Sequence, residues 1–85
     1  MITIEYTIND ELGLHARPAG LLVKLAAKHK CSATISKGAK KADLKKIFGV
    51  MGLGVKCGDS ITIACEGEDE EQAASAIAAL LKEEL

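Results

Sequence analysis

The 85-residue sequence predicts a single α+β domain, an open-faced β-sandwich in which three helices cover one face of a four-stranded antiparallel sheet. Three observations lead to this prediction. Apolar and polar residues alternate at 2–8 and 61–65, as in strands with one buried face. Apolar residues recur at helical spacing at 16–28 and 73–81. The resulting order is strand, helix, strand, strand, helix, strand, helix (βαββαβα), which suits helices packed on one side of an antiparallel sheet.

The first half of the chain contains three predicted strands and one helix. The strand at residues 2–8 buries the face formed by Ile2, Ile4, Tyr6 and Ile8. Residues 9–11 form a turn that leads into a helix from residue 16 to about residue 28. This helix directs four apolar side chains toward the sheet: Ala19, Leu22, Val23 and Ala26. Two short strands at 32–36 and 41–44 follow, and a hairpin turn at 37–40 joins them.

The second half contains a short helix at 45–53, a strand at 61–65 and a final helix. Asp69 and Gln72 resemble a capping box, in which each side chain bonds the backbone near the other at the helix start. Glu70 and Glu71 suit the positive end of the same helix. The expected buried stripe of this helix is Ala73, Ala76, Ile77, Leu80 and Leu81.

Composition argues against several classes of function. The formal net charge is −1, and Tyr6 and Phe48 are the only aromatic residues, so both the basic field and the stacking platforms of nucleic-acid binding are missing. No apolar run is long enough to span a membrane, and there is no signal peptide. Three cysteines without a Cys-x-x-Cys motif indicate reduced thiols. We therefore expect a cytoplasmic protein without a cofactor.

The run LGLHARPA at residues 12–19 joins the first strand to the first helix and contains the candidate site. Gly13 permits the unusual backbone angles of a sharp turn. Pro18 suits the first turn of a helix, because its missing N–H would have had no partner there. These two residues place His15 near the helix N-cap.

The chemistry expected at His15 follows from its neighbours in that first turn. The amides of Ala16 and Arg17 are free to bind an anion, and the helix dipole adds positive potential. Arg17 contributes a permanent charge and a forked set of donors that suits phosphate oxygens. The same positive field favours the neutral imidazole, which has a nucleophilic lone pair. The sequence thus predicts that His15 carries a phosphoryl group.

The second histidine, His29, lies between two lysines at the far end of the same predicted helix. The sequence shows no catalytic partner for it, so we interpret it as structural or solvent-exposed. Two cysteines could in principle join it at a metal site. The spacing of these residues does not match known ligand patterns, and we expect no metal.

The run GLHARPA at residues 13–19 resembles the phosphorylation site of the HPr family, the histidine-containing phosphocarriers of the bacterial phosphoenolpyruvate-dependent sugar phosphotransferase system. Residues 45–55 resemble the family's short second helix, and the likeness extends over the whole chain. The resemblance implies a carrier rather than an enzyme, with Nδ1 of His15 as phosphoryl acceptor and Arg17 stabilising the phosphate. It also implies enzyme I as donor, enzyme IIA domains as acceptors and the strand order of the sheet. We expect a monomer.

The short helix at 45–53 is too apolar for a solvated segment, since five of its side chains are large and hydrophobic. In so short a helix only one face is core, and exposed apolar clusters tend to mark contact surfaces. The resemblance implies that this helix lies beside the histidine and docks partner enzymes. We assign the docking patch to Ile47, Phe48 and Met51, and burial of all three in the core is the alternative.

The chain departs from the family at two positions. Many Gram-positive members have a regulatory serine at the start of the second helix, where a kinase phosphorylates it. Here the position is Lys46, so the resemblance does not extend to that switch. Leu12 replaces a polar residue that assists the site in some members.

Two other functions remain open at this stage. The chain could serve a paralogous relay, such as the nitrogen-related or the dihydroxyacetone branch, with the same chemistry and different partners. It could also be a regulatory interaction module that transfers no phosphate. His15 argues against the second, because a pure regulator does not need the nucleophile.

Overall fold

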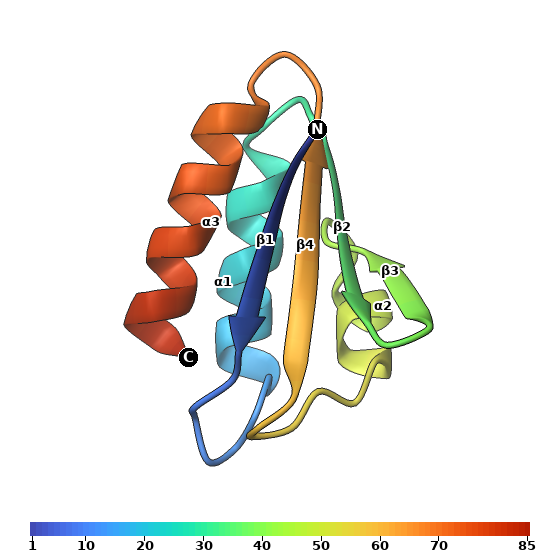
Figure 1. The fold of residues 1–85 in the computed structure, drawn as a ribbon, viewed down its shortest axis with the longest axis vertical. Helices are drawn as coiled ribbons and strands as arrows, with labels where there is room; N and C mark the ends of the chain where they lie inside the picture. Colours follow the sequence, from blue (N-terminus) through green and yellow to red (C-terminus); the bar gives the residue numbers. More distant parts are fainter.

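The computed structural model describes all 85 residues and shows helices on one side of a single sheet (Figure 1). The elements are β1 (Ile2–Thr7), α1 (Ala16–Ala27), β2 (Ser32–Lys37), β3 (Lys40–Asp43), α2 (Ile47–Gly52), β4 (Ser60–Glu66) and α3 (Glu70–Glu84). The predicted fold class and element order are confirmed. The largest change is in the second helix, which has six residues and begins two residues later than expected.

The sheet has the strand order β1-β4-β2-β3, and all three pairings are antiparallel. Strand β4, the last in sequence, therefore lies in the interior of the sheet between β1 and β2. Its register pairs Ile4 of β1 and Ile35 of β2 with the same residue, Ile63. This alignment places the apolar side chains of three strands on the face that the helices cover.

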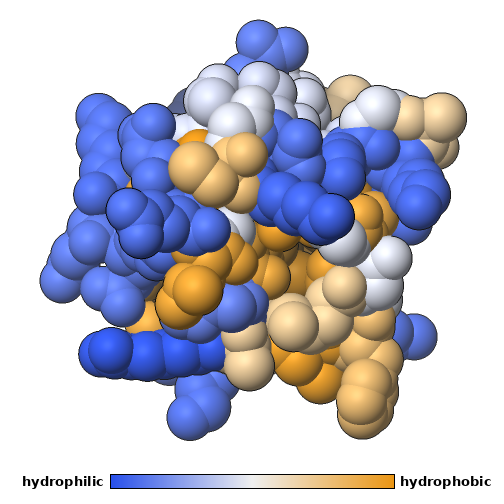
Figure 2. Space-filling model, turned by 90° about the horizontal axis from the view of Figure 1, so that it is seen from below, coloured by the Kyte–Doolittle hydropathy of each residue, from blue (hydrophilic) through white to orange (hydrophobic).

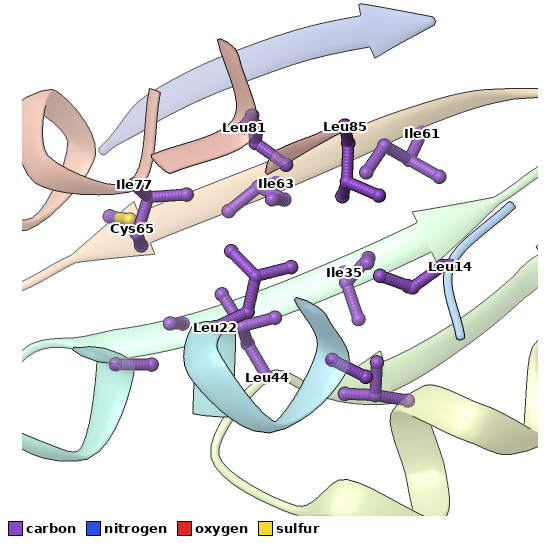
Figure 3. Close-up of a cluster of buried hydrophobic side chains, with 14 of the residues drawn as sticks. Leu14, Leu22, Ile35, Leu44, Ile61, Ile63, Cys65, Ile77, Leu81 and Leu85 are labelled. Atoms are coloured by element: carbon purple, nitrogen blue, oxygen red, sulfur yellow. The ribbon is translucent and has the colours of Figure 1, made fainter. Parts of the chain in front are cut away.

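The core fills the space between this face and the helices (Figure 3). Alternate residues of β4 are fully buried, and α1 and α3 cover them with residues that follow helical spacing. The opposite face of the sheet is open to solvent and carries polar side chains such as Thr3 and Glu5. The core contains no aromatic residue, since Tyr6 is only half-buried and Phe48 is exposed. None of the three helices has the length and hydrophobicity needed to cross a membrane.

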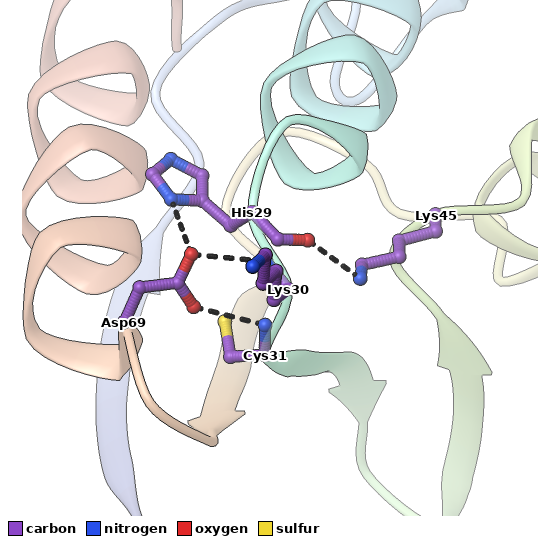
Figure 4. A network of polar contacts seen from close by, with 5 residues as sticks. All are labelled: His29, Lys30, Cys31, Lys45 and Asp69. Carbon is purple, nitrogen blue, oxygen red and sulfur yellow. Dashed lines mark hydrogen bonds and ion pairs between the residues drawn. The ribbon is translucent and has the colours of Figure 1, made fainter.

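The predicted capping box at the start of α3 is wrong. Asp69 does occupy the N-cap position, but its side chain makes no cap hydrogen bond, and Gln72 is exposed. The Asp69 carboxylate instead accepts hydrogen bonds from the backbone N–H groups of Lys30 and Cys31, each at 2.9 Å (Figure 4). These donors belong to the turn between α1 and β2, which lies beside the start of α3. The Asp69 carboxylate thus accepts two backbone hydrogen bonds from this turn, whereas capping α3 would give it only one.

The same turn is held by further polar contacts. His29 Nδ1 lies 3.3 Å from Asp69 Oδ2, and the Lys45 ammonium donates to the His29 carbonyl oxygen at 2.9 Å (Figure 4). Just before α3, the Gly67 N–H donates a hydrogen bond to Glu70 Oε1 at 3.2 Å. Asp69 thus links α3 to the α1–β2 turn rather than capping its own helix.

The two backbone donors dictate how Asp69 responds to acid. The hydrogen bond from the Lys30 amide, followed by that from Cys31, lowers the pKa of Asp69 to about 2. An aspartate in an unfolded chain has a pKa of about 3.9. Because the folded-state pKa is depressed, the carboxylate stabilises the fold above about pH 4, and this contribution is lost as the pH falls toward 2.

We therefore predict that Asp69→Asn lowers the free energy of unfolding at pH 7, and that its difference from the wild type shrinks between about pH 4 and pH 2. Urea denaturation at pH 7, 4, 3 and 2 measures this difference. The matched control is Glu68→Gln, an exposed neighbour without a hydrogen bond, which should change stability by less than about 0.5 kcal/mol at pH 7. If the stability difference between the wild type and Asp69→Asn stayed constant down to pH 2, the low pKa of Asp69 would not contribute to the stability of the fold.

Candidate functional site

The candidate site lies on the loop between β1 and α1, at the lower end of the molecule in Figure 1. Two buried side chains, Ile8 and Leu14, anchor the loop on either side. Leu14 joins the cluster that contains Ile35 and Leu85 (Figure 3). These anchors tie both ends of the loop to the core, while Asn9, Glu11 and Leu12 between them are exposed.

A close backbone contact positions the loop against the connection between α2 and β4. Gly13 has a φ of +67°, which favours glycine, and a Cβ atom there would lie 2.6 Å from the Val55 carbonyl oxygen and 2.7 Å from Lys56 Cα. The next residue, Leu14, donates its N–H to the same Val55 oxygen at 3.1 Å. Only glycine permits both the turn and this approach, as the sequence indicated for the turn.

His15 is the N-cap residue of α1, as predicted from the sequence. Its backbone is extended (φ −94°, ψ −179°), and its carbonyl oxygen accepts a hydrogen bond from Ala19 at 3.0 Å. The imidazole does not cap the helix, so both ring nitrogens are available for other contacts. The side chain is 34% exposed, which leaves it accessible to another protein while the loop shields part of the ring.

The first turn of α1 presents unpaired donors next to this histidine. The N–H groups of Ala16 and Arg17 donate no hydrogen bond within the protein, and Pro18 has no N–H to donate. Arg17 is exposed and forms no ion pair. An anion bound here would therefore meet two free amides, the positive end of the helix dipole and an unpaired guanidinium in the same helical turn.

Sequence reasoning missed one residue at this site, Asp10. Its Oδ2 atom lies 3.5 Å from His15 Nε2, and its Oδ1 accepts the Leu12 N–H at 2.9 Å. The sequence identified residues 9–11 only as a turn. The Asx turn from Asp10 to Leu12 is a local signal that could have been found, whereas the approach to His15 depends on the sharp bend at Gly13.

Comparison with known proteins identifies the family. A family model described as "PTS HPr component phosphorylation site" matches residues 2–83. The chain belongs to the HPr family. It is 47% identical over 83 residues to the phosphocarrier protein HPr of Lysinibacillus sphaericus, and the match covers 98% of this chain and 94% of that protein.

Solved HPr structures have the same fold. The histidine-containing phosphocarrier protein of Mycoplasma aligns with a TM-score of 0.94 at 39% identity, over 96% of this chain and 93% of that one. HPr of Thermoanaerobacter tengcongensis aligns with a TM-score of 0.92, also at 39% identity, over 96% of this chain and 92% of that one. The chain is thus an HPr-family phosphocarrier of the phosphotransferase system rather than an enzyme, and the family implies enzyme I and enzyme IIA as partners.

The three residues of the expected docking patch on α2 differ in their exposure to solvent. Phe48 is 90% exposed and Met51 is 38% exposed, whereas Ile47 is partly buried against the core. Val50, on the inner side of α2, is fully buried. Seen from the end of the molecule that carries the site loop, apolar surface gathers beside hydrophilic side chains (Figure 2). The short helix is therefore neither wholly core nor wholly surface.

His29 lies at the other end of α1 from the site, in the polar network around Asp69 (Figure 4). The three cysteines are free, with Cys31 and Cys65 buried and Cys57 exposed. Burial raises the pKa of the Cys65 thiol to about 11, with the neighbouring Cys31 adding to the rise, so this thiol is not poised as a nucleophile. Neither His29 nor the buried Cys65 thus offers a second candidate site.

The close contact at Gly13 gives a prediction about this loop. Gly13→Ala should lower the free energy of unfolding by more than about 1–2 kcal/mol, the cost of placing alanine in the left-handed backbone region. The additional loss is expected because the alanine Cβ would collide with the backbone at Val55 and Lys56. Gly38→Ala is the matched control, since Gly38 has a φ of +60° and open space around it. Denaturant unfolding compares the two variants, and amide NMR shifts at Leu14 report displacement of the loop. Equal losses of stability would show that the contact does not hold the loop.

Proposed function

We propose that His15 is the phosphoryl acceptor of this carrier, receiving the group from phosphorylated enzyme I and passing it to sugar-specific enzyme IIA domains. The observation that supports this most directly is the position of His15 at the N-cap of α1, beside two N–H groups that have no partner. The only other histidine, His29, is engaged with Asp69 at the far end of the helix. We further propose that the carrier acts as a cytoplasmic monomer.

In the proposed transfer, a ring nitrogen of His15 attacks phosphorus while the bond to the donor histidine breaks. Most of the catalysis in such a step comes from positioning and from stabilising charge on the phosphoryl oxygens. The amides of Ala16 and Arg17 and the Arg17 guanidinium supply that stabilisation. Nε2 faces Asp10, which leaves Nδ1, the atom used in the family, free for the phosphoryl group.

This proposal predicts that His15→Ala abolishes acid-labile labelling by phosphoenolpyruvate and enzyme I, whereas His29→Ala remains labelled. Arg17→Glu should slow transfer about tenfold or more, because a charged hydrogen bond worth about 1.5–3 kcal/mol is lost and a like charge is introduced. Rapid-quench transfer assays measure the rates, and circular dichroism confirms that each variant is folded. Labelled His15→Ala protein would contradict the assignment of the acceptor, and an unchanged rate for Arg17→Glu would remove its role.

We also propose that Phe48 and Met51, with the partly buried Ile47 beneath them, form the docking patch for both partners. An aromatic ring that is 90% exposed is unusual in a domain whose core lacks aromatics, and aromatic residues and Met are favoured at protein interfaces. Helix α2 packs against α1, so the patch lies next to the helix whose N-terminus carries His15.

Phe48→Ala is accordingly expected to raise the KM of enzyme I for the carrier by about 5–30-fold, the range for loss of an aromatic interface residue worth about 1–2 kcal/mol. Because Phe48 is exposed, the free energy of unfolding should change by less than about 0.5 kcal/mol. Thr34→Ala, on the open face of the sheet, is the control and should leave KM unchanged. A Phe48→Ala protein with the wild-type KM would show that the ring is not part of the docking surface.

Regulation by a serine kinase is proposed to be absent. Lys46 is the N-cap residue of α2 and makes no side-chain cap bond. The sequence contains no serine or threonine from residue 37 to residue 59. Just before α2, the Asp43 carboxylate accepts the Lys45 N–H at 2.9 Å. The segment that contains α2 therefore offers a kinase no serine or threonine.

A further inference from the structure

The carboxylate of Asp10 is fixed in place, with one oxygen directed at the imidazole of His15. The Asp10 N–H donates to the Leu85 main-chain oxygen at 3.2 Å, and its carbonyl accepts the Gly13 N–H at 2.9 Å. Oδ1 accepts the Leu12 N–H at 2.9 Å. The remaining oxygen, Oδ2, lies 3.5 Å from His15 Nε2. Three hydrogen bonds thus hold the residue, and the fourth contact is with the ring.

We propose that Asp10 is a positioning residue that keeps a proton on Nε2 of His15 in both the free and the phosphorylated carrier. This inference rests on the proposed function of His15. Nothing in the sequence pattern indicated it, and it depends on the geometry of the loop. It assigns the two ring nitrogens separate roles, one for the proton and one for phosphorus.

The argument starts from the hydrogen-bonding capacity of the two groups. An ionised carboxylate only accepts hydrogen bonds, and a neutral imidazole has one N–H and one lone pair. If Nε2 carried the lone pair, two acceptors would face each other at 3.5 Å. The tautomer with Nε2–H avoids this and leaves the lone pair on Nδ1. A separation of 3.5 Å is long for a hydrogen bond, and contacts of this kind shorten when the ring gains charge.

The phosphoryl cycle then requires no proton movement at His15. On loading, the Nδ1 lone pair forms the bond to phosphorus while the nitrogen–phosphorus bond of the donor breaks and its electron pair stays on the donor. The ring keeps its Nε2 proton and becomes a phosphorylated imidazolium, whose positive charge faces the Asp10 carboxylate. On unloading, a nucleophile of the enzyme IIA domain forms a bond to phosphorus while the bond at Nδ1 breaks and its electron pair returns to Nδ1. The neutral ring leaves with Nε2–H in place.

Other ionisable or charged groups belong to the elements packed around this loop. They are Glu11 in the loop, Arg17 on α1, and Lys56, Cys57 and Asp59 in the connection from α2 to β4. None of them forms an ion pair with the His15 ring, whereas Asp10 does. A substitution confined to Asp10 leaves all of them unchanged, so its effect reports on this carboxylate.

The test is nitrogen-15 NMR of histidine-labelled full-length protein, free and after phosphorylation by enzyme I. Asp10→Asn retains an oxygen for the Leu12 N–H and removes the charge. In this variant the pH at which phosphorylated His15 loses its Nε2 proton should fall by about half a unit or more. The alkaline limb of the pH profile for transfer to enzyme IIA should move down with it. The phosphorylated ring is the more sensitive state, because there the carboxylate faces a full positive charge.

Two further variants keep the outcome decisive. Glu11→Gln removes the adjacent, exposed carboxylate and should leave the midpoint unchanged. Asp10→Ser provides a second uncharged side chain that retains an acceptor for Leu12, and it should shift the midpoint as Asp10→Asn does. Wild-type midpoints in both Asp10 variants would overturn the role of Asp10 while the carrier function stands. Failure of enzyme I to label the wild-type protein on His15 would instead overturn the proposed function.

Discussion

The close approach of Gly13 to the backbone at Val55 and Lys56 is the constraint on which the site depends. It brings together two connections that are 42 residues apart in sequence, counting from Gly13 to Val55, and it fixes the direction in which α1 begins. A side chain at Gly13 would push the connections apart. The N-terminus of α1 would then lose its position relative to Asp10. The surroundings of His15 are thus set by a backbone contact that does not involve it.

The two histidines show how position along one helix decides their roles. His15, at the start of α1, is next to unpaired N–H groups and the positive end of the dipole, where an anion is stabilised. His29, after the end of α1, contacts the carboxylate of Asp69, which also accepts two backbone hydrogen bonds. The same residue type therefore lies beside unpaired donors at one end of the helix and belongs to a polar network of the fold at the other.

Much of the fold could be predicted because its signals are local. Alternation identifies β1 and β4 within a few residues. The glycine at residue 13 and the proline at residue 18 placed His15 at the N-cap of α1 correctly. The failures involve partners that are distant in sequence. Asp69 has the sequence context of a cap, but its hydrogen-bond donors are 38 and 39 residues away. The contact of Asp10 with His15 spans only five residues, but it depends on the bend at Gly13, which periodicity does not reveal. The strand order of the sheet came from the family resemblance, since periodicity alone does not place β4 between β1 and β2.

The placement of the only phenylalanine connects the core to the proposed docking. A helix of six residues has one inward face, and in α2 Val50 occupies it, with Leu53 buried just after the helix. Phe48 is then directed to solvent, although a buried phenylalanine side chain stabilises a fold by about 1.5–3 kcal/mol. Covering the ring at an interface recovers a gain of that size, which is small beside the roughly 12 kcal/mol of a nanomolar complex. A carrier that must bind a donor and then an acceptor needs contacts of this modest strength, because a permanent complex with either partner would stop the relay.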